Sequence, residues 1–462
     1  MSQPSRRGAD ARRRRTPSRP GASLRGGRLR YWLVPGIGVK RWLALVLVGE
    51  LALALAGAFV LKQIYRNIIL PGPLGGVVYV LTLQFLPYGE RAVPLLVAGI
   101  VLFLVGVVKL VRTLLLPYGD PSGPLVEVIY QKRYLARGPR VVAIGGGTGL
   151  SVLLRGLKEH TSNITAVVTV ADDGGSSGKL RMELGIAPMG DIRNCIAALA
   201  DAEPLMTQLL QYRFPDENPP SPGVGGHSFG NLLIAAMSAI EGDFEEGVRQ
   251  SNRVLAVRGQ VVPAAPVPLT LHARLLDGRE IHGQSVIARV SGIDRVWLTP
   301  GDVHATIEVL DAIAEADCIV LGPGSLYTSL LPSLLVPEVR DALAASHALR
   351  CYVCNVATQV GETEGYGLAA HIAALEAHAG ASLVDVVLVN DNLLASHPEG
   401  DLSEPVRLDW VPPRTGPEVI RRAVVDVGNA HRHDSALLAA ALLSIYQQRG
   451  RLRPPLRVAN TA

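Results

Sequence analysis

The feature that most constrains this chain is a short apolar run that passes directly into a glycine cluster and then into helical spacing. Val141–Ile144 predicts a buried strand, leucines recur at helical spacing from Leu150, and the turn between them reads Gly145, Gly146, Gly147, Thr148, Gly149. Such a strand, turn and helix are typical of βαβ units in a parallel sheet. Because the open N–H groups of a helix start favour anions, the turn predicts a phosphate site. A tight turn without a ligand is the alternative, since Leu150 replaces the third glycine of GxGxxG.

A second polar glycine loop follows the next apolar run, Ile164–Val170. Its candidate ligand residues are Asp172, Asp173, Gly174, Ser176 and Ser177. The carboxyl ends of parallel strands meet at one edge of a sheet, so we expect this loop to converge with the first. Acids here can hold a ribose, position a divalent cation or act as a base. A solvated acidic turn remains the alternative.

Two later segments place polar side chains at predicted helix starts. Asp191 and Asn194 lie in PMGDIRN ahead of an apolar helix, where Asp191 is a good N-cap. His227 and Asn231 open the predicted helix Leu232–Ile240, where they can donate to phosphate or sugar. Helix capping is the competing interpretation for both segments.

Residues 261–300 break the strand–helix alternation. Apolar and polar residues alternate over Leu269–Leu275, Asp277–Gly278 fits a hairpin turn, and Glu280–Val290 fits a return strand. This pattern predicts an antiparallel insertion. The βα texture resumes with Cys318–Leu321, followed by Gly322, Gly324 and Ser325. This third loop is a candidate anion nest, with a plain turn as the alternative.

Two groups near the C-terminus resemble metal or redox motifs, and we favour structural explanations for both. Cys351 and Cys354 form CxxC within the apolar run Cys351–Val356, which predicts a strand, as does Val384–Asn390. His431, His433 and Asp434 resemble a metal trio, but a solvated helix start is the favoured interpretation. Four cysteines in 462 residues give no disulfide framework, which suits a reducing compartment.

The first third of the chain predicts a membrane anchor. Residues 1–41 form a basic tail expected to be disordered, and residues 42–116 form a membrane segment with helices at about 42–61 and 92–111. A Pro/Gly-rich apolar connection joins these helices. Residues 68–87 of this connection are either a third span or an interfacial segment, and the sequence leaves both alternatives open. The Arg-rich start favours the cytoplasmic side, so two spans return the chain there and predict a multi-pass membrane protein.

The remaining organisation is a linker at 117–138, one domain at 139–450 and a flexible tail at 451–462. The fold class expected for 139–450 is α/β, with a Rossmann-like doubly wound, mostly parallel sheet and the antiparallel insertion. The formal net charge is +5, but residues 1–41 hold 12 Lys and Arg against one acid, which leaves −6 for the rest. This balance argues against a nucleic-acid partner.

Together the segments VVAIGGGTGLSVLLRGLK, TVADDGGSSGKLR, GDIRN, HSFGNLLIAA and LGPGSLYTSLLP resemble the gluconeogenesis factor (YvcK-like) family of the CofD-like group. The resemblance covers about 139–450 and leaves the N-terminal membrane segment outside. It implies a Rossmann-like protein that binds a UDP-sugar such as UDP-N-acetylglucosamine and regulates cell shape and envelope synthesis during gluconeogenic growth. It also implies that Gly145–Gly149 and Gly322–Ser325 cradle phosphates, Asp172 and Asp173 face ribose or metal, and His227 and Asn231 line the pocket.

The CofD branch implies an alternative function, a magnesium-dependent transferase of the 2-phospho-L-lactate type with Asp172 and Asp173 as candidate catalytic and Mg²⁺-binding residues. The late loop GPGSLYTS departs from the GPSNP-type loop of those transferases, so a non-catalytic regulator is the favoured expectation. An NAD-dependent oxidoreductase ranks third. Expected partners are the UDP-sugar, the lipid bilayer, cell-envelope synthesis proteins and a second copy of the chain in a homo-oligomer.

Overall fold

The computed structural model describes residues 134–201, 203–215, 223–380, 383–392, 402–414 and 416–450, with single residues between 50 and 100. The long ranges belong to the second of two units, Lys132–Ala462. Among the described residues, no helix has the length and apolarity needed to cross a membrane. The predicted tails 1–41 and 451–462, the two predicted spans apart from single positions, and most of the linker 117–138 lie outside the described residues.

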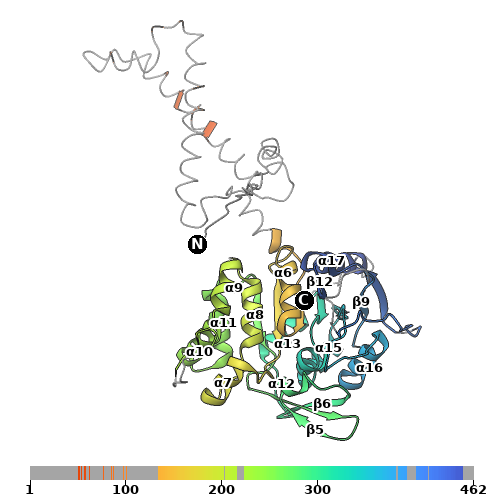
Figure 1. Ribbon diagram of the computed structural model, residues 1–462. Helices are drawn as coiled ribbons and strands as arrows, with labels where there is room; N and C mark the ends of the chain where they lie inside the picture. The colour runs from red at the N-terminus through yellow and green to blue at the C-terminus, as the bar shows by residue number, and fades with distance from the viewer. Residues whose placement is uncertain are drawn as a thin grey trace, which may run out of the picture. The chain divides into compact units, whose positions relative to one another are not determined.

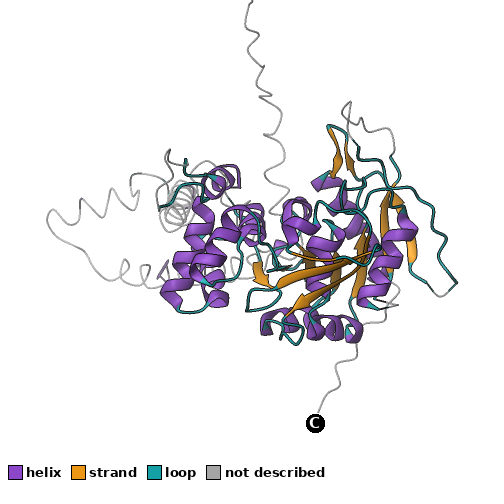
Figure 2. Cartoon of the chain, turned by 60° about the horizontal axis from the view of Figure 1, so that its bottom comes forward, coloured by secondary structure: helices purple, strands orange, loops and turns teal. Residues whose placement is uncertain are grey.

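A parallel sheet of seven strands forms the centre of the domain (Figures 1 and 2). Its order is β10-β9-β8-β7-β1-β2-β3, which confirms the predicted α/β class with a parallel sheet. The central strands read as continuous apolar runs because helices cover both faces. The strands are β1 Val141–Gly145, β2 Ile164–Val168, β3 Gln260–Pro263, β7 Cys318–Leu321, β8 Leu349–Val353, β9 Val386–Asn390 and β10 Glu418–Arg422.

Helices pack on both faces of this sheet. One face carries α6 (Gly147–Leu157), α8 (Gly190–Leu199) and α17 (Ser435–Gly450), and α6 contacts both of the others. The other face carries α13 (Ile307–Glu315), α14 (Leu331–Leu334), α15 (Pro337–Ala345) and α16 (Leu368–Ala379), and the π-helical turn η2 (Leu326–Leu330) leads into α14. The approach of α6 to α17 is close at Gly156, where a Cβ would collide with the backbone of Ser435.

A helical layer fills the connection between β2 and β3. It begins with α7 (Gly175–Leu184), and α8 then packs on the sheet. Outside α8 lie α9 (Glu203–Gln211), α10 (Phe229–Glu241) and α11 (Phe244–Val254), which Figure 1 shows as one group beside the sheet. The predicted helix Leu232–Ile240 therefore starts earlier, at Phe229, because Ser228 caps it.

The predicted antiparallel insertion is present but begins later than residue 261. Gln260–Pro263 is instead β3, the edge strand of the parallel sheet, where a terminal proline is tolerated. The insertion consists of β4 (Thr270–Leu275), β5 (Glu280–His282), the short helix α12 (Gln284–Ile287) and β6 (Ile293–Thr299), in the order β5-β4-β6. The predicted return strand Glu280–Val290 therefore divides into β5 and α12. A separate hairpin joins β11 (Val425–Asp426) to β12 (Asn429–His433).

Candidate functional site

The carboxyl end of β1 lies where the order of the sheet reverses. From β1 the chain continues to β2 and β3 on one side, and it later returns to β7 on the other side of β1. In open parallel sheets such a switch point leaves a crevice in which ligands bind. The turn after β1 and the turn after β7 meet here, because a Cβ on Gly149 would lie 2.7 Å from the Pro323 carbonyl oxygen and 2.8 Å from the Gly324 Cα. The structure thus brings the first and third predicted glycine loops into direct contact.

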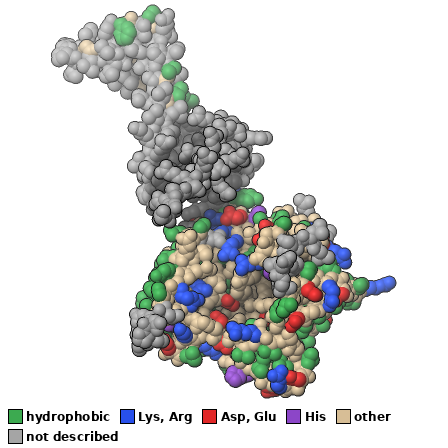
Figure 3. Space-filling view, viewed as in Figure 1, with side chains coloured by type: hydrophobic (Ala, Val, Ile, Leu, Met, Phe, Trp, Pro, Cys, Tyr) green, Lys and Arg blue, Asp and Glu red, His purple; other side chains and the backbone are tan. Residues whose placement is uncertain are grey.

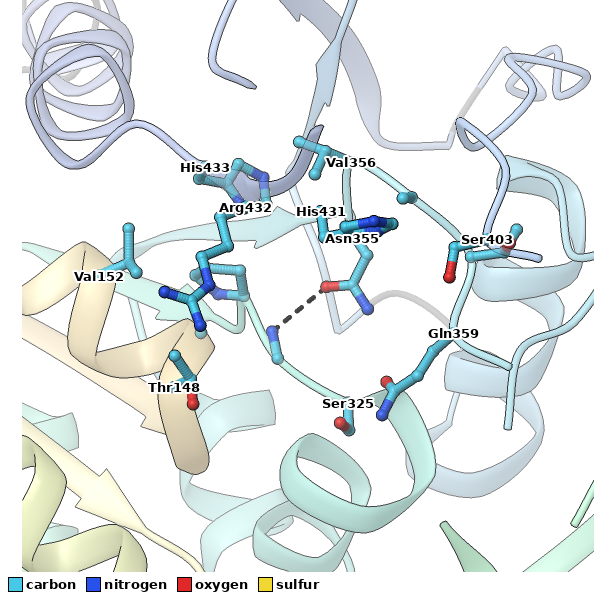
Figure 4. Close-up of a pocket in the computed structure, with 15 residues that line it drawn as sticks. Thr148, Val152, Ser325, Asn355, Val356, Gln359, Ser403, His431, Arg432 and His433 are labelled. Carbon is cyan, nitrogen blue, oxygen red and sulfur yellow. Dashed lines mark hydrogen bonds between the residues drawn. The ribbon is translucent and has the colours of Figure 1, made fainter. Parts of the chain in front are cut away.

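A pocket of about 320 Å³ opens beside these two loops (Figure 4). Its walls come from the start of α6, the turn after β7, the segment after β8 and the hairpin strand β12. In Figure 4 the side chains of Gln359 and Ser325 lie near one another, and Asn355 points into the same space. The lining residues are Thr148, Gly149, Val152, Pro323, Gly324, Ser325, Asn355, Val356, Ala357, Thr358, Gln359, Ser403, His431, Arg432 and His433.

The two helix starts at this edge differ in how their N–H groups are used. At α6, the N–H groups of Thr148 and Gly149 have no hydrogen-bond partner among the described residues. At η2, by contrast, Glu362 Oε1 accepts from Tyr327 N–H at 2.6 Å and from Thr328 N–H at 3.0 Å. A buried carboxylate therefore already caps the helix start that follows Gly322–Ser325, whereas α6 presents open donors to an anion.

Arg432 supplies positive charge to the pocket wall. It lies on β12 immediately before α17, and the packing of α17 on α6 holds β12 beside the start of α6. In Figure 4 the Arg432 guanidinium points toward Thr148. It forms no hydrogen bond or ion pair with any other described residue, so its donors are available to a ligand.

The neighbouring His433 is a neutral wall residue. It is buried, its Nε2 has no hydrogen-bond partner among the described residues, and burial lowers its pKa to about 4. The sequence interpretation of His431, His433 and Asp434 as a solvated helix start was wrong for His433, which is buried, whereas His431 is exposed; both histidines lie on β12 and line the pocket. It was right for Asp434, whose carboxylate accepts from Ala436 and Leu437 N–H at the start of α17.

An acidic pair lies on the β2 side of the Gly145–Gly149 turn. Asp172 accepts from Gly174 N–H at 3.0 Å and from the Ser177 hydroxyl, and Asp191 accepts from Gly147 N–H. Burial and then the charge of Asp172 raise the pKa of Asp191 to about 7, and burial is also the main cause that raises the pKa of Asp172. The second carboxylate oxygen of Asp191, Oδ2, is shielded from solvent and has no hydrogen-bond partner.

Asp173 has a different environment from Asp172. Its Oδ1 accepts from Ser285 N–H at 2.8 Å, so it anchors the insertion, and its charge also contributes to raising the pKa of Asp172. The predicted pair of Asp172 and Asp173 is thus joined by a third carboxyl, Asp191, whose pKa the charge of Asp172 raises. The prediction that Asp191 is an N-cap was also wrong, since α8 begins at Gly190 and the Asp191 side chain turns to Gly147.

A buried polar network extends from the acidic pair to the start of α10. Ser176 Oγ lies 3.2 Å from His227 Nδ1, and Asn231 Nδ2 donates to Ser176 Oγ at 3.1 Å and to Ser177 Oγ at 3.3 Å. The Arg193 guanidinium donates to Asn231 Oδ1 at 3.2 Å and also contacts Ser228 Oγ at 2.6 Å and Asn194 Oδ1 at 3.2 Å. His227 and Asn231, expected to line the pocket, instead belong to this network.

The acidic pair resembles a site that shares a divalent cation with a bound ligand, rather than a site built from protein side chains alone. Among the described residues, no cluster of three or more His, Cys, Asp and Glu side chains is arranged to hold a metal. Magnesium, however, is usually bound by one or two carboxylates together with substrate phosphates. The unpartnered Oδ2 of Asp191 beside Asp172 fits that type of site.

Several pocket residues were not identified from the sequence. Asn355 lay inside the predicted strand Cys351–Val356, but β8 ends at Val353, so Asn355 is a polar residue at a strand end. That position was the signal that could have found it. No local signal marks Gln359, Ser403 or Arg432 as neighbours of residue 148, because tertiary packing alone brings them there.

Comparison with known proteins agrees with this geometry. Residues 141–425 match the family described as 2-phospho-L-lactate transferase CofD. The gluconeogenesis factor of Bacillus subtilis is 47% identical over 318 residues, which are 67% of this chain and 99% of that protein. This chain belongs to the gluconeogenesis factor family of the CofD-like group. The predicted resemblance is thereby confirmed at the level of the family.

Two further proteins resemble large parts of this gluconeogenesis factor family member. A crystal structure of a UPF0052 family protein from Bacillus halodurans has a TM-score of 0.60 and 44% identity, and covers 66% of this chain and 99% of that chain. A relative from Nostoc is 45% identical over 432 residues, which are 90% of this chain and 92% of the relative. The Nostoc match therefore extends into the region before residue 139, whereas 99% of the Bacillus subtilis protein matches only 67% of this chain.

Proposed function

We propose that this family member is a membrane-tethered regulator that binds a UDP-sugar, such as UDP-N-acetylglucosamine, and acts on cell shape and envelope synthesis during gluconeogenic growth. The observation that carries the proposal is the pocket at the switch point, where the open α6 start and Arg432 face the same space. Two open N–H groups and one unpaired guanidinium suit a diphosphate. The relatives' name, gluconeogenesis factor, supports the link to gluconeogenic growth.

The rest of the pocket suits the nucleoside part of such a ligand. Asn355 uses its Oδ1 to accept from Gly324 N–H at 3.3 Å, which leaves its amide NH₂ directed into the pocket. Gln359 and Ser403 add neutral donors and acceptors on the same wall. Neutral amides and hydroxyls of this kind fix the orientation of a base or ribose without adding charge.

A direct test is calorimetric titration of UDP-N-acetylglucosamine into the full-length chain in mild detergent with magnesium, while the same mixture is assayed for product. Binding without product supports the regulator. UDP-glucose and ADP-ribose serve as comparison ligands for the sugar and the base. Absence of binding by all three would contradict the assignment of a sugar nucleotide.

The alternative function is a magnesium-dependent transferase of the CofD type, and the acidic pair favours it. Asp172 and Asp191 would hold Mg²⁺ beside the phosphates, and the metal would supply charge neutralisation on the pyrophosphate. The chain's own residues would bind the phosphates at α6 and fix the acids through Gly174, Ser177 and Gly147. Formation of a product that Asp172→Asn and Asp191→Asn abolish, and that Asp173→Asn preserves, would establish the transferase over the regulator.

The membrane tether and the envelope partners are tested separately. Membrane localisation predicts that the full-length chain sediments with membranes after high-salt washing, and that a chain lacking residues 1–124 does not. If the tether confines the regulator near envelope enzymes, its removal should impair the cell-shape function by lowering the effective concentration. Full complementation by the shortened chain would contradict a role for tethering.

A further inference from the structure

The insertion sheet has two faces of opposite character. Leu271, Ala273 and Leu298 belong to the inner face, which is buried in the main core. The outer face carries two rows of side chains that the strand register aligns across β5, β4 and β6. The first row is His282, His272 and Trp297, and the second is Glu280, Arg274 and Arg295.

The second row contains a like-charged pair. Arg274 and Arg295 are register partners on β4 and β6, an arrangement that destabilises a sheet unless an anion lies between the side chains. Glu280 Oε1 accepts from Arg274 at 3.1 Å, which compensates one of the two charges. Arg295 is exposed and forms no hydrogen bond or ion pair with another described residue.

The first row places an aromatic platform next to this charge. Trp297 stacks on His272 with ring centroids 5.4 Å apart and 14° between the planes, and the Arg274 guanidinium lies 6.0 Å from the centre of the Trp297 ring. Trp and Arg are the residues most enriched at energetically dominant positions of protein interfaces. Figure 3 shows a histidine and charged side chains among hydrophobic ones at the lower end of the domain, where Figure 1 places β5 and β6.

We propose that this outer face, defined by the six residues of the two rows, is a docking surface for an acidic, extended segment of a partner protein. A carboxylate of the segment would lie between Arg274 and Arg295, and an apolar neighbour would cover Trp297 and His272. The surface has only one more Arg than acid among its six residues, which is too little charge for a nucleic-acid backbone. The flat arrangement of two rows fits an extended chain better than a compact small molecule.

The docking surface is connected to the candidate site through the insertion. Ser285 N–H donates to Asp173 Oδ1, and Gln284 Nε2 donates to the Thr328 carbonyl oxygen at 3.1 Å. The Arg181 guanidinium of α7 donates to the Leu269 carbonyl oxygen at 2.7 Å and to the Thr270 hydroxyl at 2.8 Å. The loops after β2 and β7 therefore both hold the insertion, which gives a bound partner a physical connection to the pocket.

The test is fluorescence anisotropy of a fluorescein-labelled decapeptide of alternating glutamate and valine, titrated with the full-length chain in mild detergent. We expect micromolar binding, an affinity at least five-fold weaker for Arg295→Gln and for Arg274→Gln, and no binding of the matching lysine–valine peptide. Arg253→Gln, which removes an exposed charge from α11, is the matched control and should leave the affinity unchanged.

The outcomes separate this proposal from the proposed function. An affinity that is unchanged in Arg295→Gln, an equal loss in Arg253→Gln, equal binding of the lysine peptide, or no binding of the acidic peptide at millimolar protein would each overturn the docking surface. Neither arginine lines the sugar-nucleotide pocket. Titration of UDP-N-acetylglucosamine into the same variants therefore tests the proposed function separately, and thermal unfolding of each variant shows that it is folded.

Discussion

Gly149 lies directly against the backbone of Pro323, so that a Cβ on this glycine would come within 2.7 Å of the Pro323 carbonyl oxygen. This contact joins the turn after β1 to the turn after β7 across the switch point of the sheet. The neighbouring atom is backbone, which cannot rotate away as a flexible side chain would. The close approach of the two turns therefore depends on a residue without a side chain at position 149.

The first prediction concerns this contact. Gly149→Ala should lower the free energy of unfolding by about 1–3 kcal/mol, the usual cost of overpacking a closely packed site. It should also weaken sugar-nucleotide binding, because the start of α6 must shift. Gly223→Ala is a suitable control, since a Cβ there meets nothing within 4 Å. Denaturant unfolding and calorimetric titration of both variants check the prediction, and equal effects of the two substitutions would contradict it.

The second prediction concerns Arg432. Arg432→Gln should weaken binding of UDP-N-acetylglucosamine about ten- to hundredfold, the range for a hydrogen bond to a charged group. Stability should be unchanged, because Arg432 has no hydrogen-bond partner among the described residues. The control is Arg421→Gln on β10, which removes an exposed charge outside the pocket. Calorimetry measures the affinities, and unaltered binding by Arg432→Gln would exclude the guanidinium from the ligand site.

The third prediction concerns the pH dependence that Asp191 confers. Its pKa is raised from 3.8 to about 7, so the folded state holds this proton more tightly than the unfolded state. Burial of the Asp191 carboxyl therefore does not lower the free energy of unfolding below about pH 4, where the carboxyl is protonated in both states. The destabilisation grows as the pH rises from about 4 to 7 and is constant above that. The Asp191→Asn variant should be more stable than the parent chain at pH 8, by an amount on the order of a few kcal/mol.

Urea unfolding at several pH values, with EDTA to remove divalent cations, measures this difference. The advantage of Asp191→Asn should shrink toward zero as the pH falls to 4, where the parent carboxyl is also neutral. If the acidic pair binds the metal, added Mg²⁺ should raise the stability of the parent chain at pH 8 and leave the stability of the variant unchanged. A stability difference that is the same at pH 4 and pH 8 would show that the carboxyl is not perturbed.

The fourth prediction concerns Glu362. Glu362→Ala leaves the Tyr327 and Thr328 N–H groups of η2 without a partner, which costs about 1–3 kcal/mol for each buried amide. Glu362→Gln keeps an oxygen that can accept both N–H groups, and it removes the ionisable carboxyl whose pKa burial raises. We therefore expect the glutamine variant to retain most of the stability in denaturant unfolding. An alanine variant as stable as the glutamine variant would contradict this role.

Local sequence predicted the strands at the centre of the fold closely. Cys318–Leu321 was predicted with the bounds of β7, and Val141–Ile144 with all but the last residue of β1, because continuous apolar runs ending in glycine have few other structures available. The hairpin turn at Gly278 was equally local, since Asp277 accepts from Arg279 N–H and Gly278 takes a positive φ. The exposed β10 and the two-residue β11 lack such runs and were not predicted.

What the amino-acid sequence determined by itself was thus the α/β class, the glycine turn after β1 and the polar residues at the ends of β2 and β7, because hydrophobic periodicity and glycine act over a few residues. Tertiary structure alone placed Asp191 beside Asp172 and joined Asp173 to the insertion through Ser285. It also brought Arg432 to Thr148, through the packing of α17 on α6 across 284 residues of chain. Such contacts depend on the sum of many weak packing interactions between distant segments, and no short stretch of sequence contains that sum.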